Sequence, residues 1–218
     1  KKKEPGDQLF DGFDATALNK ELKSIMDGLS VKVFRTYNAS ITLDKLLRDQ
    51  EVLRDAAATV DERKADYDRA NKEVAILCNH QRSVPKAHQD QLGKMEAKLQ
   101  EMNAELVELE EDLRLAIKGK TKRVAKEDGG FKDVTLNEDA VRKKIVRKKE
   151  AIAKKQLQAA VKEDLKTVAL GTSKINYMDP RITIAWCKRN DVPIEKIFNK
   201  SLLAKFAWAM EVEPTFVF

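Results

Sequence analysis

The sequence of 218 residues lacks an apolar run long enough to span a membrane, and aromatic residues make up only 6% of it. Charged residues, in contrast, make up 36% of the chain. A chain with this composition is too charged to be a compact globule throughout. We therefore expect no membrane partner, and one or more packed regions joined to a long, solvated helical element.

Cysteine and histidine are also scarce, with two residues of each type. Cys78 and Cys187 lie far apart, and no Cys/His cluster has zinc-ligand spacing, so no structural metal is predicted. Separated thiols are typical of a reducing compartment. The net charge of +6 favours an acidic partner, but residues of both signs are abundant, so charge alone does not identify a nucleic acid.

The first half of the chain reads as linker and helices. It opens with three lysines and no initiator methionine, which we interpret as part of a longer protein. The β-branched residues of 30–42 fit a strand, but the pattern that continues from Leu43 favours a helix. A clearer helix is predicted for residues 59–80, where Thr59 and Glu62 have the spacing of a capping box.

Residues 85–165 predict an antiparallel coiled-coil hairpin. Apolar residues alternate steps of three and four in the first helix: Leu92, Met95, Leu99, Met102, Leu106, Leu109 and Leu113. The first helix is acidic outside this seam and the second is basic. Gly119, Gly129 and Gly130 indicate a turn region between them, and residues 135–138 have the form of a second capping box. Few apolar faces remain, so the hairpin should protrude.

Residues 166–218 predict a small helical domain. Asp179-Pro180 is a typical helix start, Pro193 precedes a short helix, and residues 201–210 fit a last helix. The apolar tail 216–218 should dock. The expected fold is mainly α, with a helical catalytic subdomain (1–84), the hairpin (85–165) and the C-terminal domain (166–218).

Three polar residues, Arg35, His80 and Tyr177, lie within apolar helical segments. Each also fits an ordinary structural role, and periodicity alone does not make any of them catalytic. The strings that contain them are more specific: VFRTYNAS (33–40), AILCNHQR (75–82) and LGTSKINYMDPR (170–181). Together with AWCK (185–188), PIEKI (193–197) and KFAWA (205–209), they resemble the C-terminal part of eukaryotic type IB DNA topoisomerases, in the family's order.

The resemblance implies an enzyme that relaxes double-stranded DNA without ATP, metal or cofactor. It implies that Tyr177 is the nucleophile, that Arg35 holds the scissile phosphate, and that His80 donates to a non-bridging oxygen. It further implies a monomeric, nuclear enzyme. Other residues match positions that line the DNA or the cleavage site in that family: Lys32, Gln81, Arg82, Thr172, Lys174 and Asn176.

The family's second arginine and its general-acid lysine belong upstream of residue 33, in sequence that this chain lacks. We therefore expect the chain to act only with the upstream part of the enzyme. Two other hypotheses remain open from the residues alone. A tyrosine recombinase shares the Arg, His and Tyr chemistry, and a coiled-coil scaffold could bind nucleic acid through its basic helix without catalysis.

Asn176 generates a prediction, because the matching position in the family helps to bind camptothecin-type poisons, which trap the cleaved complex. Enzyme reassembled with this chain should religate DNA more slowly when such a poison is present. Religation rates measured with and without the drug test this, and equal rates would count against the assignment.

Overall fold

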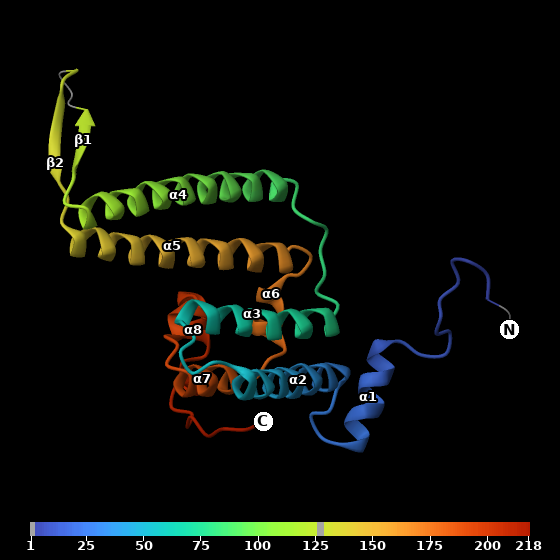
Figure 1. The fold of residues 1–218 in the computed structure, drawn as a ribbon. Coiled ribbons are helices and arrows are strands. Elements are labelled where there is room, and N and C mark those ends of the chain that lie inside the picture. Colours follow the sequence, from blue (N-terminus) through green and yellow to red (C-terminus); the bar gives the residue numbers. More distant parts are fainter. Residues whose placement is uncertain (1–2, 126–128) are drawn as a thin grey trace. The chain divides into compact units, whose positions relative to one another are not determined.

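The computed structural model of the chain describes residues 3–125 and 129–218. The fold is mainly α, as predicted, and divides into two units, Lys1–Arg82 with Val168–Phe218, and Ser83–Thr167 (Figure 1). The first unit contains α1 (Ala15–Ile25), α2 (Val31–Leu53), α3 (Val60–Leu77), α6 (Leu170–Asn176), α7 (Pro180–Arg189), η1 (Ile194–Lys196), α8 (Lys200–Lys205) and η2 (Ala207–Ala209). The second contains α4 (His88–Ile117), β1 (Thr121–Ala125), β2 (Phe131–Thr135) and α5 (Glu138–Asp164). Within the described ranges, no helix is both long and apolar enough to cross a membrane.

Local signals set several helix ends as predicted. Thr59 begins α3 with a complete capping box: its Oγ1 accepts from the Glu62 backbone N–H at 3.3 Å, and Glu62 Oε2 accepts from the Thr59 N–H at 2.7 Å. Asp179 caps α7, with Pro180 at its first position. The segment 30–42, for which strand and helix competed in the sequence, is helical: Ser30 is the N-cap and residues 31–42 are the first half of α2.

The core of the first unit joins helices from both ends of the chain. The rings of Tyr67 on α3 and Trp186 on α7 lie 5.2 Å apart between centroids, and neither residue is exposed. Leu43 and Leu47 of α2 are fully buried in the same cluster. Burial of such large side chains contributes roughly 1.5–3 kcal/mol each, so this cluster holds α2, α3 and α7 together.

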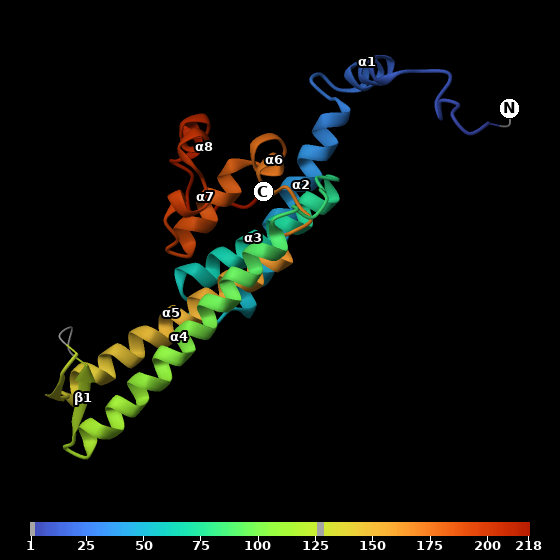
Figure 2. The ribbon, with the colours of Figure 1, turned by 90° about the horizontal axis from the view of Figure 1, so that it is seen from above.

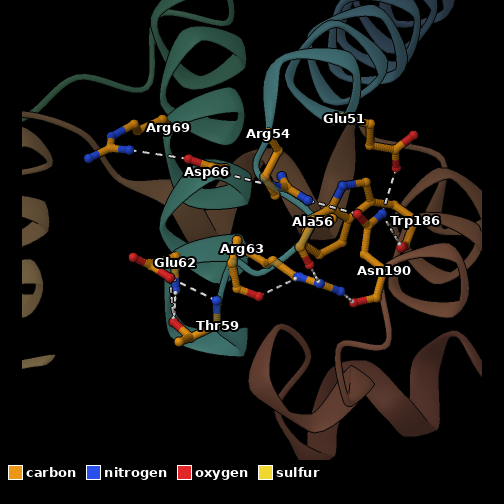
Figure 3. A network of polar contacts seen from close by, with 11 residues as sticks. Glu51, Arg54, Ala56, Thr59, Glu62, Arg63, Asp66, Arg69, Trp186 and Asn190 are labelled. Carbon is orange, nitrogen blue, oxygen red and sulfur yellow. Dashed lines mark hydrogen bonds and ion pairs between the residues drawn. The ribbon is translucent and has the colours of Figure 1, made fainter. Parts of the chain in front are cut away.

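A polar network closes one end of this core (Figure 3). Asn190, which ends α7, accepts through Oδ1 from Arg54 Nη1 at 2.7 Å and donates through Nδ2 to Glu51 at 2.6 Å. Its backbone carbonyl accepts from Arg63 of α3, and Arg54 Nε donates to Asp66 at 2.9 Å. The ends of α2 and α7 and the beginning of α3 are thereby fixed at one point.

The second unit is an antiparallel helical hairpin, in which α4 and α5 lie side by side in two views (Figures 1 and 2). Val141, Ile145 and Ile152 of α5 are buried, and the predicted apolar seam of α4 is half-buried. Acidic α4 and basic α5 form cross-helix ion pairs, among them Lys148 with Glu105 and Lys149 with Glu110 at 3.2 Å. The predicted charge pairing is confirmed.

The connection between these helices differs from the prediction. The glycines indicate a turn region between the helices, but β1 and β2 there form an antiparallel two-stranded sheet in which Thr121 pairs with Thr135. The predicted capping box at 135–138 is wrong, because Thr135 belongs to β2. Asn137 caps α5 instead, and its Oδ1 accepts from the Ala140 N–H at 2.9 Å.

The C-terminal prediction is partly confirmed. The helix predicted for residues 201–210 is divided into α8 and η2, with Phe206 between them. Phe216 and Phe218 of the tail pack against the core, whereas Val217 is exposed.

The buried Tyr67–Thr183 hydrogen bond generates a stability prediction. The two hydroxyl oxygens lie 2.8 Å apart between α3 and α7. Tyr67→Phe should lower the free energy of unfolding by about 1–3 kcal/mol, because it leaves the buried Thr183 hydroxyl without this partner. Denaturant unfolding measures the change. The matched control is Tyr37→Phe at an exposed tyrosine, which should change stability by less than about 0.5 kcal/mol, and equal effects would contradict this view.

Candidate active site

The C-terminal cap of α3 positions His80. The N–H of Asn79 donates to the Ile76 carbonyl at 2.9 Å, and the N–H of His80 donates to the Ala75 carbonyl at 2.7 Å. These two bonds form a Schellman motif, with Asn79 in the left-handed conformation at φ 58°. The carbonyl of His80 then accepts from the Ala169 N–H at 2.9 Å, which fixes His80 beside the start of α6.

Tyr177 is placed by a turn that follows α6. Its backbone N–H donates to the Ser173 carbonyl at 2.9 Å, and the Met178 N–H donates to the same carbonyl at 3.1 Å. Ser40 of α2, fully buried, reaches this turn from the other side. Its hydroxyl donates to the Tyr177 carbonyl at 3.3 Å and accepts from the Asp179 N–H at 3.0 Å. The backbone of Tyr177 is thus held by both α6 and α2.

The three residues singled out in the sequence come together at the Tyr177 side chain. Arg35 Nη1 lies 3.5 Å from Tyr177 Oη, and the guanidinium carbon lies 5.4 Å from the centre of the tyrosine ring. The rings of His80 and Tyr177 are 5.4 Å apart between centroids. These residues come from α2, the end of α3 and the end of α6, and Arg35 and Tyr177 are 142 positions apart in the sequence.

The electrostatic surroundings of the tyrosine are cationic. Lys32 Nζ lies 6.0 Å from the centre of its ring, and the Arg35 guanidinium carbon lies 5.4 Å from the same point. Burial lowers the pKa of His80 below 6.5, and the positive charge of Arg35 lowers it further. The neutral form of His80 is therefore favoured. A tyrosine with two cations and an imidazole near its ring is suited to meet an anionic group such as a phosphate.

The remaining predicted residues are placed differently. Asn176 Nδ2 donates to the Thr172 carbonyl at 3.2 Å on exposed turns of α6. Gln81, which pairs with Val168 in an antiparallel bridge, and Arg82 are both exposed.

Lys174 turns inward. Its Nζ donates to the Ile197 carbonyl at 3.4 Å and lies 5.9 Å from the centre of the Tyr67 ring, and burial lowers its pKa. The structure therefore does not bring Lys174 to the tyrosine hydroxyl. Its role in DNA binding stays a prediction.

Sequence reasoning missed the two buried serines at the site, Ser40 and Ser173. Both lie within the strings VFRTYNAS and LGTSKINYMDPR, but a single serine in such a string has no distinctive pattern of its own. Ser40 could have been found from its position next to Ala39 on the buried face of α2, where a polar side chain needs a partner.

Comparison with known proteins assigns the chain to a protein family. Residues 1–113 match the family model of the eukaryotic DNA topoisomerase I catalytic core, and residues 149–218 match that of the C-terminal topoisomerase domain. DNA topoisomerase 1 beta of Arabidopsis thaliana is 55% identical over 97% of this chain, and DNA topoisomerase 1 of Daucus carota is 49% identical over 99%. The mitochondrial DNA topoisomerase I of Homo sapiens is 44% identical over 95%.

The chain belongs to the eukaryotic DNA topoisomerase I family, as the resemblance implied. It spans only part of these relatives: 22% of the Arabidopsis protein, 30% of the Daucus protein and 33% of the human one.

The position of Arg35 beside His80 generates a titration prediction. Arg35→Gln should raise the pKa of His80, because it removes one of the two causes that lower it, while burial should keep the pKa below 6.5. NMR titration measures this directly, since the chain has two histidines and His88→Gln assigns the spectrum. An unchanged His80 pKa in Arg35→Gln would show that the two side chains do not interact.

Proposed function

We propose that this chain supplies the nucleophile and part of the phosphate-binding site of a type IB DNA topoisomerase, which relaxes supercoiled double-stranded DNA. The observation that carries the proposal is the convergence of Arg35 and His80 on the Tyr177 side chain. The family relationship supports the reaction class and argues against the tyrosine-recombinase and scaffold alternatives.

In the proposed reaction, Tyr177 Oη attacks the phosphorus of a DNA phosphodiester. Oη gives up its proton to solvent as its bond to phosphorus forms, and the bond from phosphorus to the 5′ oxygen breaks. The products are a 3′-phosphotyrosyl ester and a DNA end with a 5′ hydroxyl, which receives a proton as it leaves. The ester retains the energy of the original bond, so religation is the reverse attack and needs no ATP.

Arg35 and His80 have separate roles in this proposal. Arg35 holds the non-bridging oxygens with its planar set of donors, and His80 donates a hydrogen bond as negative charge builds on the phosphate. Preorganised donors of this kind commonly lower a barrier by roughly 3–4 kcal/mol each. The proposed chemistry uses no metal ion and no cofactor.

The chain is proposed to act as a portion of a monomeric enzyme, with residues 1–84 and 166–218 around the tyrosine and a linker hairpin at 85–165. The second arginine and the general-acid lysine implied by the resemblance would come from the upstream part. Lys32, Gln81, Arg82, Thr172 and Asn176 would contact DNA, with salt-sensitive binding through the cations. Camptothecin-type poisons are the proposed inhibitors. We propose nuclear residence, although the human relative is named as mitochondrial.

Covalent trapping on a nicked suicide DNA duplex tests the proposal. The chain mixed with the upstream part of the enzyme should form a denaturation-resistant DNA adduct, and Tyr177→Phe should abolish it because phenylalanine has no nucleophilic oxygen. The chain alone should form none.

Tyr37→Phe is the matched control, since Tyr37 is exposed and its substitution removes the same atom elsewhere on the unit. Its adduct yield should equal that of the unmodified chain. An adduct from the chain alone would overturn the requirement for the upstream residues, and an adduct with Tyr177→Phe would overturn the assigned nucleophile.

A further inference from the structure

Ser173 contacts both His80 and the turn that carries Tyr177. It lies on α6, is fully buried, and its Oγ is 2.7 Å from His80 Nδ1, although the two residues are 93 positions apart. Its backbone carbonyl also accepts the N–H groups of Tyr177 and Met178. One residue therefore ties the imidazole to the backbone of the tyrosine.

The contact at Nδ1 determines whether the other ring nitrogen, Nε2, can donate a hydrogen bond. A neutral imidazole carries one proton, and it can donate through Nε2 only if Nδ1 is the acceptor. The lowered pKa of His80 favours this neutral form. A hydroxyl that donates to Nδ1 would select the tautomer with the proton on Nε2, whereas a hydroxyl that accepts from Nδ1 would leave Nε2 without a proton.

A second neighbour bears on which way the serine hydroxyl points. Cys78, which ends α3 and is buried, interacts with Ser173, and burial raises the pKa of its thiol. The serine hydroxyl has one proton to donate, and a sulfur is only a weak acceptor, whereas an unprotonated imidazole nitrogen accepts well. The serine proton therefore favours His80 Nδ1 over Cys78.

We propose that Ser173 is a positioning residue that holds His80 in the tautomer protonated on Nε2. The catalytic consequence rests on the proposed function, because His80 must donate to the phosphate for the tautomer to affect cleavage. The tautomer itself does not depend on that function and can be observed in the chain without DNA.

The first test is a long-range ¹H–¹⁵N spectrum of the two histidines in the full chain near neutral pH, with His88→Gln for assignment. His80 should show an acceptor nitrogen at Nδ1 and a protonated Nε2. In Ser173→Ala the two tautomers should mix. Ser40→Ala is the matched control, since Ser40 is an equally buried serine that holds the Tyr177 turn through its own hydroxyl, and the tautomer should not change.

The unmodified chain alone can overturn the assignment: a His80 protonated on Nδ1 would mean that Ser173 accepts rather than donates. A Ser173→Ala chain that is folded by circular dichroism and shows an unchanged tautomer would overturn it as well.

The second test is a double-mutant comparison of adduct formation in the mixture with the upstream part. Ser173→Ala should slow cleavage roughly tenfold or more, the size of effect typical when the hydrogen-bond partner of a metal-ligating histidine is removed. In a His80→Gln background it should have little further effect, because it acts through His80. Equal slowing in both backgrounds would mean that Ser173 is merely structural. If the unmodified mixture forms no adduct, the proposed function fails, and the histidine spectra still decide the tautomer.

Discussion

The packing of α7 against α2 and α3 is the constraint on which the site depends. Tyr177 reaches Arg35 and His80 only because the segment after α6 is anchored by Trp186 in the core and by Asn190 in the polar network of Figure 3. In that network Arg54 is almost fully removed from water and Arg63 is half-buried, so each needs its partners to offset desolvation. The network therefore favours one alignment of these helices, and this alignment positions the Tyr177 side chain.

The site is built from backbone geometry as much as from side chains. His80 is oriented by the left-handed Asn79, and Tyr177 lies in a turn whose carbonyl and N–H groups are taken by two buried serines. Neither of these two arrangements involves a contact with the Tyr177 hydroxyl. Exposed residues such as Arg35 supply the charge at the site, and the buried residues behind them fix the positions of the functional side chains.

Much of the fold could be predicted from the sequence, because its helices are signalled locally. The capping box at Thr59, the Asp179-Pro180 start and the seam from Leu92 to Leu113 each depend on residues close together in the chain. The pair of strands at the hairpin tip was missed because Thr121–Ala125 is short and charged, and pairing with Phe131–Thr135 decides its structure. Arg35, His80 and Tyr177 were found through the strings that contain them. Ser173 was not assigned a role, since the partner of a buried serine 93 positions away has no local signature.

The bridge between Gln81 and Val168 has a consequence for how this kind of chain can vary. It joins the point where the chain leaves the first unit to the point where the chain returns. His80 and Ser173 are therefore held together at the base of an 85-residue insertion, Ser83–Thr167. The entropy of closing such a loop grows only with the logarithm of its length. The insertion can therefore gain or lose residues at little thermodynamic cost to its base, so the length of the hairpin can change while His80 and Ser173 stay in contact.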